Sequence, residues 1–146
     1  KQYDASVKDL DESLATIEFL AELYGATNLH GSHFSKGQVG FFGCSGVNIG
    51  IHKIPETEIY YLLYQGFTKI RNLPKKVMVT HVHPTGLKMG ELSTFFEGSQ
   101  GVRTAVDKLK PDLLLCSHVH EAEGMEEIIG KTKIINVSRK GKIIEI

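Results

Sequence analysis

Two short apolar runs, each leading into a His-x-His tripeptide, dominate the hydrophobic pattern of this chain. Residues 77–80 (VMVT) precede the tripeptide at 81–83, and residues 113–116 (LLLC) precede the tripeptide at 118–120. Each run is too short for a helix and is bounded by Pro or charged residues, which is typical of a strand buried on both faces. The pattern predicts two buried strands with a pair of imidazoles at the carboxyl end of each.

An amphipathic helix is predicted between these strands. Apolar residues recur at spacings of three and four between residues 99 and 110, Ser99 is a suitable N-cap, and Pro111 stops the helix. Strand, crossover helix and strand form a right-handed βαβ unit, so the two strands run parallel. Both tripeptides therefore point to the same sheet edge, where ligands bind in open α/β folds.

The imidazoles at this edge are candidate metal ligands. Neutral imidazole binds Zn, Mn, Fe and Ni, and strand ends can fix a coordination geometry, which makes His81, His118 and His120 the predicted ligands. His83 lies in a turn before Pro84, where a structural role is as plausible as a ligand role. Three other histidines have no buried strand before them and are expected outside the cluster: His30, His33 and His52.

The N-terminal half predicts two more helices and a strand. The first helix begins at the capping pair Asp9 and Glu12, ends at Gly25, and is expected to cover a face of the sheet. Residues 38–42 predict a strand that ends in a glycine-rich turn at 43–46. A second helix begins near Pro55 and has a buried stripe that reaches Ile70.

The C-terminal region changes to short β segments separated by Gly and Lys. These segments, at 124–129, 133–137 and 142–146, predict an antiparallel meander. No repeat or linker interrupts the chain, so residues 1–146 are expected to form a single α/β domain.

The overall charge and hydropathy argue against a nucleic acid or a membrane as the partner. With 17 basic and 17 acidic residues and a pI near 7.2, the chain shows no electrostatic patch for nucleic acid or an anionic membrane. No segment resembles a membrane span or a signal peptide. Cys44 and Cys116 lie in apolar surroundings and indicate reduced core residues of a cytoplasmic protein. Basic residues near the C-terminus alternate with Ile and Val, which is typical of a solvated strand face: Lys131, Lys133, Arg139, Lys140 and Lys142.

The two His-bearing segments resemble the last two sequence blocks of the calcineurin-like metallophosphoesterases. Residues 79–84 (VTHVHP) are similar to the block in which a strand ends in a ligand His, and residues 115–122 (LCSHVHEA) are similar to the Gly-His-x-His block. Shorter similarities extend this resemblance over nearly the whole chain, to the small single-domain archaeal and bacterial members: 28–31, the turn at Gly43, 98–99, 111–112 and 133–136.

The resemblance implies a four-layer αββα sandwich that holds two divalent metals, commonly Mn, Fe, Zn or Ni. Its chemistry is hydrolysis of a phosphomonoester or phosphodiester by a metal-bridging hydroxide, so no side-chain nucleophile is needed. By the family's pattern, His81 and His118 would bind one metal and His120 the other. The implied partner is a small phosphoester substrate.

Other ligands of the family pattern are missing from this chain. The blocks Asp-x-His, Gly-Asp and Gly-Asn-His-Asp/Glu do not occur, and none of the five Asp residues ends a predicted buried strand. A bridging carboxylate is needed to offset the repulsion between two cations. The chain is therefore expected to be the C-terminal portion of a metallophosphoesterase domain, with an unpaired apolar sheet edge or a second chain that supplies the missing half. Alone, it is expected to be inactive and to hold at most one metal weakly, through His81 and His118.

Smaller departures from the family pattern leave alternatives open. Ser117 replaces the usual Gly and would be strained if that position needed a positive φ. His83 could face substrate or solvent, and Glu121 could support a ligand His or be solvated surface. Two other functions compete with the enzyme: a non-catalytic scaffold or protein-binding module on the same fold, and a small mononuclear His-rich metal protein complete at 146 residues.

Overall fold

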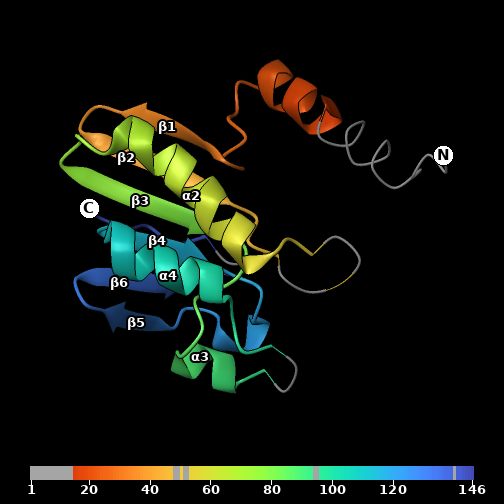
Figure 1. Ribbon diagram of the computed structural model, residues 1–146, viewed down its shortest axis with the longest axis vertical. Coiled ribbons are helices and arrows are strands. Elements are labelled where there is room, and N and C mark those ends of the chain that lie inside the picture. The colour runs from red at the N-terminus through yellow and green to blue at the C-terminus, as the bar shows by residue number, and fades with distance from the viewer. Residues whose placement is uncertain (1–14, 48–49, 51–52, 94–95, 140) are drawn as a thin grey trace, which may run out of the picture.

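One mixed sheet of six strands organises the protein. A computed structural model describes residues 15–47, 50, 53–93, 96–139 and 141–146, and within them the strand order is β1-β2-β3-β4-β6-β5 (Figure 1). The inner strands β2, β3, β4 and β6 run parallel, whereas β1 and β5 are antiparallel edge strands. The fold class is therefore α/β, as predicted. The strands are β1 (Ser32–Lys36), β2 (Val39–Cys44), β3 (Lys75–Thr80), β4 (Leu113–Cys116), β5 (Glu126–Ile129) and β6 (Thr132–Asn136).

The two apolar runs form the centre of this sheet. Strands β3 and β4 pair in parallel, with Met78 opposite Leu114. Both of these side chains are fully buried against the helices, whereas Val77 and Leu113 are buried on the opposite face. Burial on both faces explains why the sequence shows continuous apolar runs in place of alternation.

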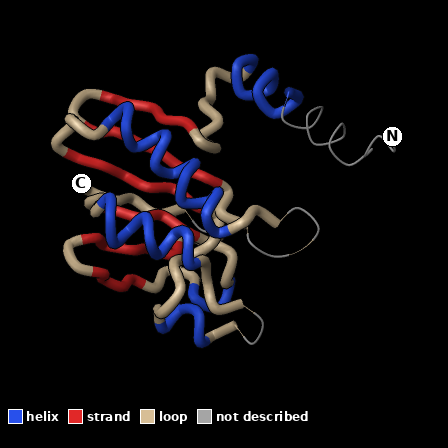
Figure 2. Tube along the Cα trace, in the orientation of Figure 1, coloured by secondary structure: helices blue, strands red, loops and turns tan. Residues whose placement is uncertain are grey.

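Helices α2 (Glu56–Ile70) and α4 (Gln100–Leu109) cover one face of the sheet (Figure 2). Helix α2 packs on β1 and β2 and against α4. Gly66 permits this approach, because a Cβ at that position would lie 2.3 Å from the carbonyl oxygen of Ser32 in β1. The buried stripe of α2 follows the predicted period and consists of Ile59, Leu63, Gly66 and Ile70. None of the helices in the described ranges is long and apolar enough to cross a membrane.

Ser99 caps α4, as predicted. Its Oγ accepts a hydrogen bond from the Val102 amide (3.1 Å) and donates one to Glu56 Oε2 (2.6 Å). The same Glu56 oxygen accepts from the Gly101 amide, so α2 and α4 are joined where both helices begin. This junction lies at the start of α4, the helix of the crossover that connects β3 to β4.

Replacing Ser99 with Ala is expected to lower the free energy of unfolding by about 1–2 kcal/mol, because a buried cap and its link to Glu56 are both lost. Urea unfolding followed by circular dichroism measures the change. The matched control is Thr104→Ala, which removes an exposed hydroxyl bonded to the Gln100 carbonyl within the same helix and should change stability little. Equal losses in both variants would contradict a special role for the Ser99 cap.

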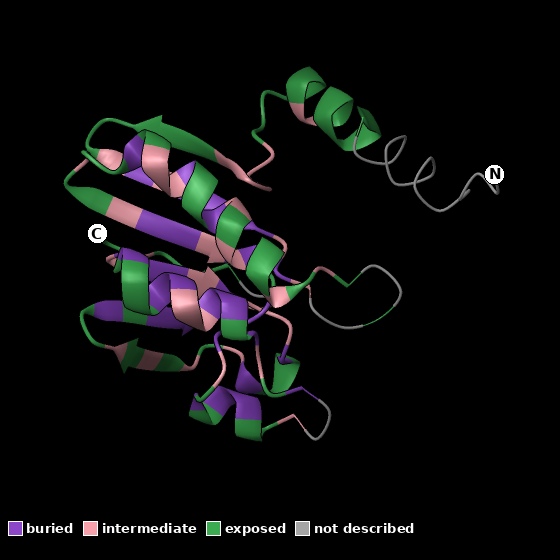
Figure 3. Cartoon of the chain, in the orientation of Figure 1, coloured by how far each residue is buried: buried purple, intermediate pink, exposed green. Residues whose placement is uncertain are grey.

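The sheet face opposite the helices carries a second apolar cluster. Strands β3 and β6, which contribute to this cluster, contain buried segments (Figure 3). Val77, Leu113 and Ile135 are its buried centre, and Val137 and Ile144 of the C-terminal region pack against it. Its other members are half-buried: Val39, Phe41, Val79 and Leu115. The edges differ from the prediction, because β1 is a mostly exposed strand with polar residues and β5 carries Glu126 and Glu127 and is exposed or half-buried along its length. The apolar surface that is only partly covered is thus a face of the sheet, and the predicted apolar edge is not observed among the described residues.

Three other predictions about the elements are wrong. Residues 15–23 are helical but stand apart from the sheet (Figure 1), with Phe19 63% and Leu23 62% exposed, so they do not cover a face; the capping pair Asp9 and Glu12 lies outside the described residues. Gly43 and Cys44 belong to β2, since they pair with Val79 and Thr80 of β3. Residues 142–146 form no strand, so the antiparallel part of the C-terminal region is the single pair β5–β6.

The basic C-terminal residues are solvated, as predicted. Lys133 and Lys142 both pair with Glu126, and Lys131 pairs with Asp112 at 3.6 Å. Arg139 is exposed, and Lys140 lies outside the described residues.

Candidate metal centre

The carboxyl ends of β2, β3 and β4 meet at one edge of the sheet, and the predicted histidines lie there. His81 follows β3 directly, His118 follows β4 after Ser117, and His120 begins the short 3₁₀ helix η1 (His120–Ala122). Backbone hydrogen bonds hold the segments together: the His81 amide donates to the Ser45 carbonyl (3.1 Å), and the Ser117 amide donates to the His81 carbonyl (2.9 Å). The parallel pairing of the strands thus brings residues 37 positions apart into contact.

His81 and His118 form the closest pair of candidate ligands. His118 Nδ1 lies 3.0 Å from His81 Nε2, and the rings are nearly perpendicular with centroids 5.0 Å apart. Two imidazoles that bind one ion through bonds of ~2.0–2.1 Å have their nitrogens ~3 Å apart. The donor atoms of this pair therefore fit two neighbouring positions of one metal ion.

The surroundings of His118 favour its neutral form. Burial and the nearby His81 and His120 rings lower the pKa of His118 below its ordinary value. Only neutral imidazole binds a metal, so protons compete less with a metal at this residue than at an exposed histidine.

His118 is held in a strained turn. Its φ is +66°, and the Val119 amide donates to the Ser117 carbonyl (2.9 Å), which closes a three-residue γ-turn centred on His118. A left-handed backbone costs a residue other than glycine roughly 1–2 kcal/mol. The positive φ falls on His118, so replacing the family's Gly by Ser117 brings no left-handed strain. Strain of this kind is concentrated at functional sites.

His120 and Glu121 are exposed, and neither joins the His81–His118 pair as the predicted metal site required. His120 lies near enough to affect the pKa of His118. However, no three His, Cys, Asp or Glu side chains in the described ranges lie close enough together to hold a metal. The predicted convergence of three rings on one point therefore holds only for His81 and His118. Among the described residues, Glu121 makes no hydrogen bond to these imidazoles.

His83 lies in the wall behind the site. It is fully buried, and neither ring nitrogen has a hydrogen-bond partner among the described residues. Burial, assisted by His118, lowers the pKa of His83 to about 4. Gly90 allows close packing here, because a Cβ at that position would lie 2.9 Å from His83 Nε2. Of the alternatives that the sequence left open for His83, a ring that faces substrate or solvent is wrong, whereas a structural role agrees with its burial.

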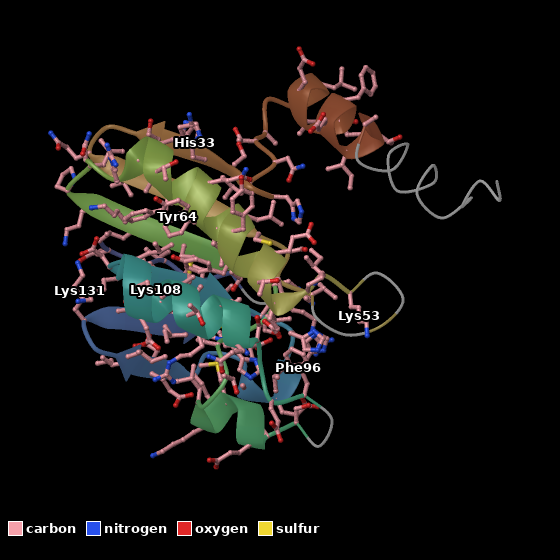
Figure 4. All side chains as sticks on the ribbon, in the orientation of Figure 1. His33, Lys53, Tyr64, Phe96, Lys108 and Lys131 are labelled. Carbon is pink, nitrogen blue, oxygen red and sulfur yellow. The ribbon has the colours of Figure 1, made fainter. Side chains whose placement is uncertain are left out.

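Phe96 connects His83 to His118 and was missed by sequence reasoning. Its ring contacts His83 edge-on, with centroids 5.4 Å apart, and packs on His118 at 4.4 Å. Figure 4 shows Phe96 beside the segment that follows β4, on the side away from β1. A phenylalanine in a loop carries no periodic signal, so only the folded arrangement identifies it as part of the wall.

The loop that carries Phe96 is anchored to the sheet. It contains the short helix α3 (Lys88–Glu91), and Glu127 of β5 accepts hydrogen bonds from the Lys88 and Met89 amides at 2.9 Å each. Beneath the loop, the Cys116 thiol lies 3.9 Å from Met89 Sδ, and burial raises its pKa to about 12. Cys116 and Cys44 are both free and buried, as predicted, so neither is a reactive thiolate.

Two of the other histidines lie near β1: His30 at the same sheet edge as the candidate site, and His33 on the strand itself. His30 precedes β1, and because β1 is antiparallel to β2, it lies at the same edge, where its Nδ1 accepts from the Ser45 amide (3.3 Å). It makes no contact with the His81–His118 pair among those described. His33 is exposed on β1 (Figure 4), and His52 lies outside the described residues.

The fold is shared with two solved structures. One has 20% sequence identity and a TM-score of 0.67, with 86% of this chain and 51% of that chain covered. The other, the protein TT1561 of Thermus thermophilus, has 17% identity and a TM-score of 0.62, with 92% of this chain and 59% of that chain covered. This chain thus spans between half and three-fifths of their length. No family model and no curated protein matches it.

Proposed function

We propose that this chain carries the histidine side of the metal centre of a phosphoesterase, with His81 and His118 as ligands of one divalent ion. The observation that carries the proposal is the 3.0 Å approach of His118 Nδ1 to His81 Nε2 at the carboxyl ends of parallel strands. The resemblance of residues 79–84 and 115–122 to the calcineurin-like metallophosphoesterases supplies the reaction class.

In the proposed enzyme, His120 is a ligand of a second ion, and the bridging carboxylate comes from outside the described residues. Bound metals of this class supply a hydroxide of lowered pKa and charge that stabilises the phosphoryl oxygens. The residues of this chain orient and desolvate the site: Phe96 packs on one ring of the pair, and His83 lies behind Phe96. Free, buried Cys44 and Cys116 fit a reducing compartment such as the cytoplasm.

The apolar sheet face is where the remainder of an αββα sandwich would pack. Val77, Leu113 and Ile135 form a core on this face, and half-buried Phe41 and Leu115 extend it. A second sheet, from the same polypeptide or from a second chain, would bury these residues and bring its carboxylates to the histidine edge.

Metal binding tests the proposal. Isothermal titration with Zn²⁺ and with Mn²⁺ is expected to show one weak site, because among the described residues two imidazoles are in direct contact and no third ligand joins them. His81→Ala and His118→Ala should each weaken binding at least ~10-fold, since half of the donor pair is lost. His33→Ala, on β1, is the matched control and should bind like the parent chain. Equal weakening by all three variants, or no binding by the parent, would contradict the assignment.

A non-catalytic binding module is the second candidate. The observation that favours it is that no group of three ligand side chains occurs among the described residues. Under this hypothesis, the apolar sheet face binds another protein and His81→Ala leaves that binding unchanged.

A further inference from the structure

Asn136, the last residue of β6, connects the candidate site to the neighbouring strand. Its side chain is fully buried. Nδ2 donates to the Val119 carbonyl (2.8 Å) and to the Ser117 carbonyl (3.3 Å), while Oδ1 accepts from the Ser138 amide (3.1 Å). Two acceptors and one donor surround this amide, so only one of its two flipped orientations satisfies all three contacts.

The two carbonyls that Asn136 binds belong to the residues on either side of His118. The γ-turn at His118 brings these carbonyls to the positions that one amide group can reach. If His118 relaxed to a negative φ, the separation and direction of the carbonyls would change and the amide could no longer bind both. Each hydrogen bond that exists only in the strained turn offsets part of the strain.

The third contact of the amide involves a second strained residue. Ser138 has a φ of +38°, and its amide is the group bound by Asn136 Oδ1. The Val137 amide also donates to the Cys116 carbonyl (2.8 Å), which fixes this segment to the end of β4. One buried side chain thus ties the His118 turn to the segment that leaves β6.

We propose that Asn136 is a positioning residue: it holds the turn that directs the His118 imidazole toward His81. The metal-binding part of this proposal rests on the proposed function, whereas the effect on ring orientation does not. In the sequence, Asn136 stood out only as the last residue of the segment 133–136 that resembles the family. The sequence does not show what an amide at the end of a strand binds.

The experiment compares the parent chain with Asn136→Leu, which keeps the branched shape of the side chain but has neither a donor nor an acceptor. The variant is expected to bind Zn²⁺ about 10- to 100-fold more weakly. In metal-free protein, the ring protons of His118 are shifted by the ring current of Phe96, and this NMR shift should move toward the value of an exposed histidine. The matched control is Thr132→Val, which removes a buried hydrogen bond from the same strand to the Pro111 carbonyl at the opposite edge. It should keep both the Zn²⁺ affinity and the ring shift.

The parent chain provides a measurement that does not depend on whether the variant folds. Scalar couplings across hydrogen bonds should connect the Asn136 side-chain amide to the carbonyl carbons of Ser117 and Val119, and their absence would overturn the proposal. If folded Asn136→Leu keeps the parent's Zn²⁺ affinity and ring shift, the positioning role is wrong and the proposed function stands. If the parent binds no Zn²⁺, the proposed function fails, and the ring shift alone decides the role of Asn136: its loss supports the role and its retention overturns it.

Discussion

The 146-residue chain supplied with Mn²⁺ is expected to leave a generic aryl phosphodiester unhydrolysed. Among the described residues, His81 and His118 are the two candidate ligands in contact, and no carboxylate joins them to form a three-ligand site. Without a second cation, both the shared hydroxide and half of the phosphoryl clamp are lost. Release of aryl alcohol, followed by absorbance, measures the rate. Robust metal-dependent turnover by this chain would mean that a ligand set beyond these histidines is present.

A longer form that carries the missing carboxylate motifs is expected to turn over. Under the proposed function, His118→Ala in that form removes a metal ligand, which is expected to cost several kcal/mol of transition-state stabilisation and to lower the rate roughly 10²- to 10³-fold. His33→Ala should leave the rate unchanged, because His33 is exposed on β1 away from the site. Full activity in the His118→Ala form would exclude this residue as a ligand.

His83→Leu is expected to stabilise the protein at pH 7.5 by about 1–3 kcal/mol, because it removes a buried imidazole without hydrogen-bond partners among the described residues. The variant should also flatten the pH dependence of stability. The pKa of His83 is about 4 in the folded protein, below the ordinary value of ~6.5 in the unfolded chain. The unfolded state therefore binds more protons at intermediate pH, and stability falls as pH drops from ~6.5 toward ~4.

The loss of stability over that pH range should be on the order of 2–3 kcal/mol in the parent and clearly smaller in His83→Leu. Guanidinium unfolding at pH 7.5, 6 and 5 in the presence of a chelator measures both effects. His33→Leu removes an exposed imidazole and serves as the control, with a pH dependence like that of the parent. Destabilisation of His83→Leu at pH 7.5 would show that the His83 nitrogens have partners in solution, such as ordered water.

The parts of the fold that sequence reasoning predicted are those with local signals. Residues 77–80 and 113–116 are short, mainly apolar and clearly bounded, and the helix between them has a cap residue and a helical period. The crossover makes the two strands parallel, and parallel strands carry their carboxyl ends, and thus both histidine segments, at one edge. The His81–His118 pair follows from these few rules.

The errors concern interactions between distant segments. An apolar stripe in residues 15–23 predicts that one face of the helix is buried, but it does not show which surface of the protein the helix packs against. Gly43 and Gly46 suggested a turn over 43–46, yet pairing with β3 extends β2 over Gly43 and Cys44. Strand β1 has a largely polar sequence and was not predicted, so the position of His30 at the same sheet edge was not foreseen, although His30 lies outside the His81–His118 pair as expected.

Within the site, the supporting residues were the least predictable. The burial of His83 depends on the path of the loop between β3 and α4, and the position of Phe96 depends on the same loop. Asn136 acts through backbone carbonyls of another strand. Each of these roles arises only when three or more segments meet, and no spacing within the chain encodes it.

The left-handed backbone at His118 has a consequence for the evolution of the protein. Glycine would adopt this conformation without strain, so selection for thermal stability alone would favour Gly at this position and would remove the imidazole. A population selected for heat resistance without a functional requirement should therefore lose the histidine early, and its persistence would show that function is being maintained.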